Sequence, residues 1–168
     1  MTITLHDLTV PAILRGLAAL SAILDKGRAY ADENGMAHTE LLDARLYADM
    51  APLTAQVQRV SDTAKGAMVR IGGVENVAMA DVEASFEELQ ARIARTVEFV
   101  KAVPREAIDG KEDAKVVLTT PGGDIPFTGR NFVTGFVLPN LYFHITTSYA
   151  ILRMKGVPVG KLDYLGSS

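Results

Sequence analysis

The chain has 168 residues, no cysteine, and 17 basic against 20 acidic residues, which gives a formal net charge of −3. A chain of this length can bury one apolar core unaided, so we expect a single domain over residues 1–168. The lack of cysteine excludes a disulfide framework, a thiolate metal site and a cysteine nucleophile, and it favours a cytoplasmic location. Lysines and arginines do not cluster among aromatic residues, so we expect no nucleic-acid partner.

The amino-terminal residues lack the features of a secretory or membrane segment. The stretch MTITLHDLTVPAIL has no basic region followed by a long apolar run, as a signal peptide would have. No stretch approaches the roughly 20 apolar residues of a membrane span. The sequence therefore predicts a soluble, unprocessed protein that does not associate with a membrane.

Apolar residues at three- and four-residue spacing predict the first helix, over about residues 10–31. Pro11 fits the first turn if the helix starts near Thr9, whereas a start near Thr4 requires a kink at the proline. The Asn34-Gly35 pair that follows predicts a turn, with His38 as a solvated loop histidine.

The next helical region is predicted in two parts. Thr39 caps a short first part that continues to Tyr47. Because proline is tolerated only in the first turn of a helix, Pro52 predicts a break and then a main helix that Asp49 caps. Gln56 would then lie near the middle of the bundle.

The third periodic run is the most regular in the chain. Apolar residues from Val82 to Val100 follow helical spacing, and the run ends before Pro104. Its charged side chains are expected to form a solvated face with supporting ion pairs: Glu83, Glu87, Glu88, Arg92 and Arg95.

The hydrophobic period changes after residue 111. Residues 115–119 are rich in β-branched side chains, residues 121–124 have turn composition, and residues 125–128 can return as a second strand. We expect a small β-hairpin, with Pro126 confining the second strand to an edge or to irregular pairing. A fourth helix follows, broken near Pro139 and stopped by Gly156, and the tail packs back on the bundle or frays.

Four amphipathic helices of around 20 residues, each about 30 Å long, are the material of a four-helix bundle. The predicted fold is therefore all-α: a four-helix bundle with a small β-hairpin inserted between helices three and four. The first two helices are joined by a short loop and are expected to be antiparallel. Roughly thirty residues separate the last two helices, which permits a long crossover.

The densest polar signal lies in the fourth helix, PNLYFHITTSYAILRMKG at residues 139–156. Helical spacing puts four of its side chains on one stripe: Asn140, His144, Thr147 and Ile151. Together with Gln56, and with Tyr142 or Tyr149, this stripe could orient a small-molecule ligand, and His144 could act as a general acid or base. The alternative is structural, with the histidine bonded so as to fix the helix register.

Three stretches resemble the bacterial domain-of-unknown-function family nineteen-ninety-three: PNLYFHITTSYAILRMKGVPVGKLDYLG at 139–166, DMAPLTAQVQ at 49–58 and TGRNF at 128–132. The PN-x-YFH and GK-x-DYLG pieces are the most specific, and the likeness spans nearly the whole chain. That family is similar to the DinB/YfiT superfamily of four-helix proteins, many of which are regarded as metal-dependent enzymes. The resemblance implies a DinB-like bundle with a long connection between helices three and four, often a homodimer, and no particular reaction.

In the wider superfamily, a divalent metal such as zinc or nickel is held by one histidine of the second helix and a His-x-x-x-His pair of the fourth. The resemblance places His144 at the second position of that pair, because Leu152-Arg153 follows at the expected distance. Asn140 stands at the first position, and the second helix has no histidine, so Gln56 or Asp49 would have to serve. Amide oxygens are weak ligands for such metals, so we expect no metal cofactor; if any metal binds, its ligand is His144.

Three functions stay open at this point. The first is a cytoplasmic bundle protein that lacks the metal triad and keeps a ligand-binding or structural polar pocket at His144. The second is an enzyme, a metal-dependent or thiol-dependent hydrolase or transferase, which uses His144 with Gln56 or Asp49. The third is a dimeric structural or interaction module.

Overall fold

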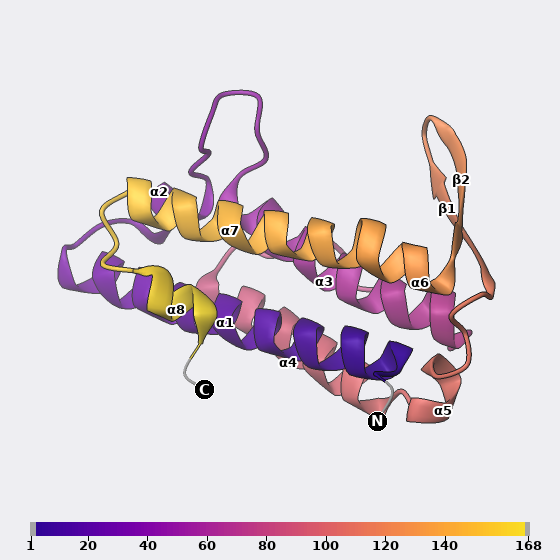
Figure 1. Ribbon diagram of the computed structural model, residues 1–168. Helices are drawn as coiled ribbons and strands as arrows, with labels where there is room; N and C mark the ends of the chain where they lie inside the picture. Colours follow the sequence, from indigo (N-terminus) through magenta and orange to yellow (C-terminus); the bar gives the residue numbers. More distant parts are fainter. Residues whose placement is uncertain (1–2, 167–168) are drawn as a thin grey trace.

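The computed structural model describes residues 3–166 and consists of four long helices, short helical segments and one hairpin (Figure 1). The long helices are α1 (Leu5–Glu33), α3 (Leu53–Gly72), α4 (Phe86–Ala102) and α7 (Leu138–Met154). The short ones are α2 (His38–Leu42), α5 (Arg105–Ile108), α6 (Gly129–Phe132) and α8 (Lys161–Leu165), and the π-helical turn η1 (Val133–Val137) joins α6 to α7. Strands β1 (Lys115–Thr120) and β2 (Gly123–Thr128) pair antiparallel. The predicted all-α class with a hairpin before the last long helix is confirmed.

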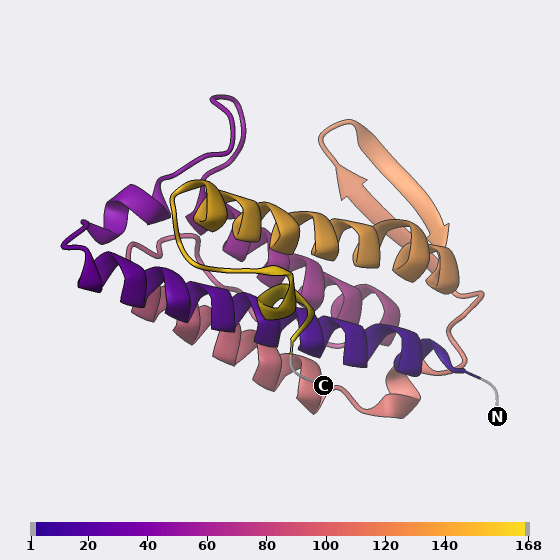
Figure 2. The ribbon, with the colours of Figure 1, turned by 60° about the vertical axis from the view of Figure 1, so that its left-hand side comes forward.

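Helix α1 lies against α4 and α7, and so does α3, which places α1 and α3 diagonally across the core. Helices α1 and α7 run parallel, because Gly16 faces Ile145 and Gly27 faces Leu152. A Cβ atom at these glycines would lie 2.7 Å and 2.9 Å from those side chains, so the glycines permit the close approach. Helices α3 and α4 run in the opposite direction (Figures 1 and 2). The helices therefore run up, down, down, up.

This order makes the connection between α3 and α4, residues 73–85, the long crossover of the fold. Because α3 and α4 are parallel, the chain must return along the whole bundle between them (Figure 1). The sequence permitted a crossover between the third and fourth helices. The structure has the expected long connection there, residues 103–137 with the hairpin, but it joins the antiparallel helices α4 and α7. The first two long helices are antiparallel as expected, although they are not neighbours.

A buried arginine of α4, Arg92, holds this crossover segment on the bundle. The side chain of Arg92, which is 1% exposed, pairs with three carboxylates at 2.9–3.0 Å: Asp62, Asp81 and Glu83. Arg92 also donates to the carbonyl oxygen of Ala80 at 3.1 Å. Burial alone would raise the pKa of Glu83, but hydrogen bonds from Gln58 and Arg92 outweigh it and keep that pKa below its usual value.

The expectation that Arg92 belongs to a solvated face is therefore wrong. The third long helix starts at Phe86, after a Ser85 cap, rather than near Val82. Val82 is 77% exposed and lies with Glu83 in the crossover segment. Helical periodicity could not reveal this, because it identifies a face of a helix but not the segment that covers it.

The second helical region also differs from its prediction. Helix α2 follows Ala37 rather than a Thr39 cap, and it ends before Tyr47, which is 72% exposed. Asp49 is exposed in the loop of residues 43–52, and Pro52 stands at the cap position of α3 without a side-chain bond. A backbone hydrogen bond takes the place of a capping side chain: the amide of Leu53 donates to the carbonyl oxygen of Ala44 at 3.0 Å.

Helix α1 takes the earlier of its two possible starts, with Thr4 and Asp7 forming a capping box, and it continues through Pro11. By length and composition α1 could also cross a membrane, with a mean hydropathy of 1.5 in an 18-residue window that is 44% buried. No such stretch was expected from the sequence. The inner face of α1 packs on α4 and α7, as the core helix of a soluble protein does.

Two further local expectations are settled by the structure. His38 starts α2 rather than lying in a solvated loop, and its ring bonds Asp32 at 2.7 Å and meets the Phe86 ring edge-on at 5.3 Å. The break expected near Pro139 is the π-helical turn η1, which directly precedes the first turn of α7. Because proline cannot donate a backbone hydrogen bond, the helix there must take a different pattern.

Replacing Arg92 by alanine is expected to lower the free energy of unfolding by about 3 kcal/mol, because Glu83 would lose the partner of a largely buried charge. Arg95→Ala on the exposed face of the same helix is the matched control, with an expected loss of about 0.5 kcal/mol or less. Urea unfolding of the two variants measures the difference. Equal losses would show that the buried ion pairs do not hold the crossover segment.

Candidate functional site

A groove between α3 and α7 contains the strongest candidate site. Its cavity volume is about 300 Å³. Helix α3 and α7 supply the polar wall, and the hairpin with the segment after it supplies the apolar wall. The residues that line this α3/α7 groove are Arg59, Asp62, Thr63, Arg70, Leu118, Phe132, Phe136, Asn140 and His144.

His144 is 8% exposed, and its Nδ1 atom lies 2.7 Å from Oε1 of Gln56, which is 1% exposed. The amide nitrogen of Gln56 donates to the carbonyl oxygen of Ala51 at 2.9 Å, which fixes the amide orientation. Oε1 can only accept, so Nδ1 of His144 must carry the proton. In the neutral ring Nε2 is then an acceptor with a free lone pair.

Nε2 of His144 opens on the groove. It has no hydrogen-bond partner within residues 3–166. In that part of the chain, Arg92 Nε is the only fully buried side-chain nitrogen or oxygen without a partner, so Nε2 is not sealed in the core. Burial, and to a smaller extent the nearby charge of Arg59, together lower the pKa of His144 from 6.5 to about 4. The ring is therefore neutral at physiological pH.

Asn140 presents a second acceptor one helical turn before His144. Its Nδ2 atom donates to the hydroxyl oxygen of Thr63 at 2.7 Å, and that hydroxyl donates in turn to the carbonyl oxygen of Arg59 at 2.7 Å. The single proton of the hydroxyl is thus committed, which assigns the Asn140 nitrogen to Thr63 and leaves Oδ1 without a partner among the described residues. Two acceptors therefore lie one turn apart on α7.

The apolar wall of the groove consists of aromatic rings. Phe132 and Phe136 stack with centroids 5.5 Å apart and an interplanar angle of 13°, and Phe127 of β2 tilts against both. Leu118 of β1 lies beside them in the wall. The hairpin therefore supplies part of the binding surface, which explains why the insertion matters for the site.

Two arginines of α3 stand at the edge of the groove. Arg59 and Arg70 are exposed and form no ion pair within the part of the chain that the structure describes. The guanidinium of Arg70 folds back over Gly66, in the space that a Cβ atom there would take. Asp62 also lines the groove, but its carboxylate already pairs with Arg92 at 3.0 Å and Lys65 at 3.3 Å. The groove edge consequently carries unneutralised positive charge.

The structure brings together His144, Gln56 and Asn140, but not the other predicted site residues. Tyr142 lines a different cavity, between α1, α7 and α8. Asp49 is exposed in its loop and does not line the groove.

Sequence reasoning missed the residues of α3 and the aromatic wall. Arg59 and Thr63 follow Gln56 by three and seven residues, so helical spacing puts all three on one face. Phe132 and Phe136 are four apart and precede the PNLYFH stretch. Following the face of Gln56 along its own helix would have identified Arg59 and Thr63.

The donor set of the groove does not fit a zinc or nickel centre. Such a centre takes imidazole, thiolate or carboxylate ligands, usually three of them. Here the groove offers one imidazole nitrogen, one amide oxygen and the carboxylate of Asp62, which is already paired with Arg92 and Lys65. Oε1 of Gln56 is turned to His144 instead. Within residues 3–166, no three His, Cys, Asp or Glu side chains form a group that could hold a metal ion.

The depressed pKa of His144 makes stability depend on pH. Below about pH 6.5 the unfolded chain protonates this ring, while the folded one resists protonation until about pH 4. The unfolded state then binds more protons, so stability falls as pH falls through this window, by up to about 3 kcal/mol from this group. The variant His144→Gln should lose that part of the dependence. Urea unfolding between pH 7 and about pH 4 measures it, and parallel curves for both proteins would contradict the assignment.

Comparisons with known proteins agree with this architecture. The sequence matches the model of the family described as Domain of unknown function (DUF1993) over residues 5–165. Among solved structures, the chain is similar to the crystal structure of a DinB family member protein from Shewanella denitrificans, at 38% identity over 98% of this chain and 93% of that chain, with a TM-score of 0.88. No curated protein matches the chain. The chain therefore belongs to the DUF1993 family and has the fold of a DinB family member.

Proposed function

We propose that the α3/α7 groove binds a small organic molecule without a metal ion. The observation that carries this proposal is the pair of free acceptors, Nε2 of His144 and Oδ1 of Asn140, each fixed by a hydrogen bond on its other side. Buried or half-buried polar groups are normally paired, so two oriented acceptors that open on a cavity suit a ligand that brings the donors.

Binding is favoured over acid–base catalysis by the pKa of His144. A general base works best when its pKa lies near the operating pH. With a pKa of about 4, the imidazole is always neutral near pH 7 and has little drive to take a proton. It is well suited to accept a hydrogen bond and poorly suited to remove a proton.

The other walls narrow the ligand class. The aromatic wall at Phe132 and Phe136 suits a flat or apolar body. The exposed arginines at the groove edge suit an anionic substituent. A volume of about 300 Å³ is at the lower end of small-molecule pockets. The ligand class is therefore a small aromatic or apolar compound that carries an N–H or O–H donor and, at its outer end, a negative charge.

A soluble cytoplasmic protein and a homodimer are also part of this proposal. The homodimer rests on the sequence resemblance, and the cytoplasmic location rests on the lack of cysteine. No residue of the groove is needed for either, so the ligand proposal does not depend on them.

A thermal-stability screen tests the proposal, using indoles, phenols and primary amides with and without a carboxylate. A ligand at about 100 times its Kd should stabilise the folded protein by about 2.7 kcal/mol, a rise in Tm of roughly 5–10 °C for a domain of this size. The rise should vanish in Asn140→Ala and persist in Thr146→Ala, an exposed position on the same helix.

Two results of this screen would contradict the proposal. One is a set of hits that stabilise Asn140→Ala as much as the wild-type protein. The other comes from a parallel arm with zinc or nickel chloride, in which stoichiometric metal bound by the wild-type protein and lost in His144→Ala would show a metal site.

A further inference from the structure

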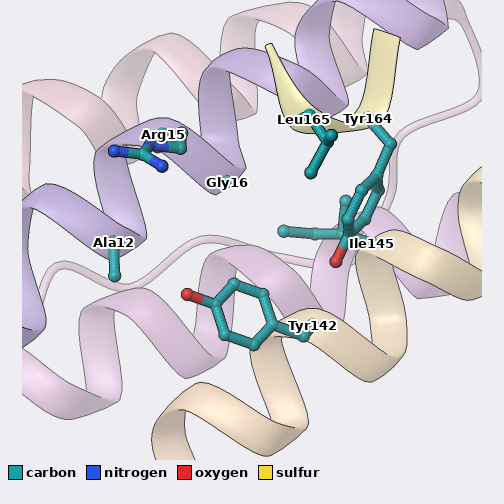
Figure 3. A pocket seen from close by; sticks show the side chains of 7 residues that line it. All are labelled: Ala12, Arg15, Gly16, Tyr142, Ile145, Tyr164 and Leu165. Carbon is teal, nitrogen blue, oxygen red and sulfur yellow. The ribbon is translucent and has the colours of Figure 1, made fainter. Parts of the chain in front are cut away.

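A second cavity lies on the opposite side of α7, between α1, α7 and α8 (Figure 3). Its volume is about 220 Å³. The cavity is lined by Ala12, Arg15, Gly16, Tyr142, Ile145, Tyr164 and Leu165. None of these residues lines the α3/α7 groove, so the two sites share a helix but no side chain.

The short helix α8 roofs this cavity and is anchored in place. Asp163 pairs with Lys26 of α1 at 2.7 Å and accepts a hydrogen bond from the amide of Gly160 at 2.8 Å. The ring of Tyr164 meets that of Tyr149 edge-on, with centroids 6.4 Å apart. These contacts set Tyr164 and Leu165 over the gap between α1 and α7 (Figure 3). One side of the cavity is therefore covered by a segment that is anchored to α1 and α7.

The polar side chains that line this cavity, Arg15, Tyr142 and Tyr164, can all donate hydrogen bonds to a ligand. The phenol of Tyr142 points from α7 toward Ala12 of α1, and the phenol of Tyr164 descends from α8 beside Ile145 (Figure 3). Neither phenol oxygen has a hydrogen-bond partner within residues 3–166, and Arg15 has no ion pair there. Among residues 3–166, no carboxylate side chain lines the cavity. The site thus offers one guanidinium and two hydroxyls beside apolar walls.

We propose that this cavity is a second ligand site, which takes a small monocarboxylate with an aromatic or compact apolar body. A guanidinium binds a carboxylate through two parallel hydrogen bonds, and the phenol hydroxyls of Tyr142 and Tyr164 are further donors in the cavity lining. The rings of Tyr142 and Tyr164, with Ile145 and Leu165, cover the apolar part. The proposal is independent of the α3/α7 groove, which presents acceptors instead of donors at its base.

Benzoate is the probe, and benzamide is its neutral counterpart of the same shape. Benzoate should bind with a Kd of about 1 mM, as expected for a ligand of so few atoms, and benzamide at least about tenfold more weakly, because it lacks the charge. Titration followed by 1H–15N NMR spectra measures both affinities. The shifted amides should include those of Gly16 and Ile145, which lie in the cavity wall.

Matched variants locate the binding site. Arg15→Gln should weaken benzoate binding about tenfold and Tyr142→Phe about threefold, since each removes a donor to the carboxylate. Arg15 and Tyr142 are exposed enough for these changes to leave the fold intact. Arg95→Gln removes an exposed arginine of α4 that lines neither cavity, and it should leave the affinity unchanged.

Three outcomes would overturn the second site. Benzoate binding that is unchanged in Arg15→Gln and lost in Arg59→Gln would assign the probe to the α3/α7 groove. Equal affinities for benzoate and benzamide would refute recognition of the charge. No shifts at Gly16 and Ile145 up to tens of millimolar benzoate would show that the cavity takes no carboxylate. The first of these results would make benzoate a ligand of the α3/α7 groove, whereas the other two leave the proposal for that groove to its own screen.

Discussion

The hydrogen bond between Nδ1 of His144 and Oε1 of Gln56 is the interaction on which the candidate site depends. It joins α7 to α3 inside the bundle. The hydrogen bond from the Gln56 amide nitrogen to the carbonyl oxygen of Ala51 orients the amide, so that His144 is the donor and Gln56 the acceptor. A buried amide with a fixed orientation dictates which ring nitrogen holds the proton. The fold therefore sets the chemical character of the groove, because the same contact that aligns two helices also leaves Nε2 as a free acceptor.

Two amide side chains, Asn140 and Gln56, accompany His144 in the candidate site. In this chain, the amide of Asn140 donates a hydrogen bond to Thr63, and the amide of Gln56 accepts one from His144. Imidazoles at those positions could bind a metal, whereas amides build a hydrogen-bonded network with residual acceptors. The fold alone does not determine function.

Much of the fold follows from hydrophobic periodicity. The four long helices, the hairpin and the central place of Gln56 were all predictable, since each rests on local spacing or turn composition. The crossover between α3 and α4 was not, because periodicity does not say which helices are neighbours. For the same reason the buried role of Arg92 could not be recognised from a charged position on an amphipathic helix.

The candidate site was predictable in part. One stripe of α7 correctly united Asn140 with His144, and the buried face of α3 added Gln56. Tyr142 is two residues from His144, about 200° around the helix, so helix geometry places it on the opposite side. Asp49 was assigned as a helix cap, but the chain closes its own loop there. The aromatic wall depends on tertiary packing of the hairpin, which no local pattern shows.

The ring 15N chemical shifts of His144 at neutral pH test the central claim most directly. The signal can be assigned by its loss in His144→Gln. The structure predicts a protonated Nδ1 and an unprotonated Nε2, with shifts typical of a pyrrole-like and a pyridine-like nitrogen respectively. A proton on Nε2, or a doubly protonated ring, would show that Gln56 does not set the tautomer and that the groove has no acceptor at His144.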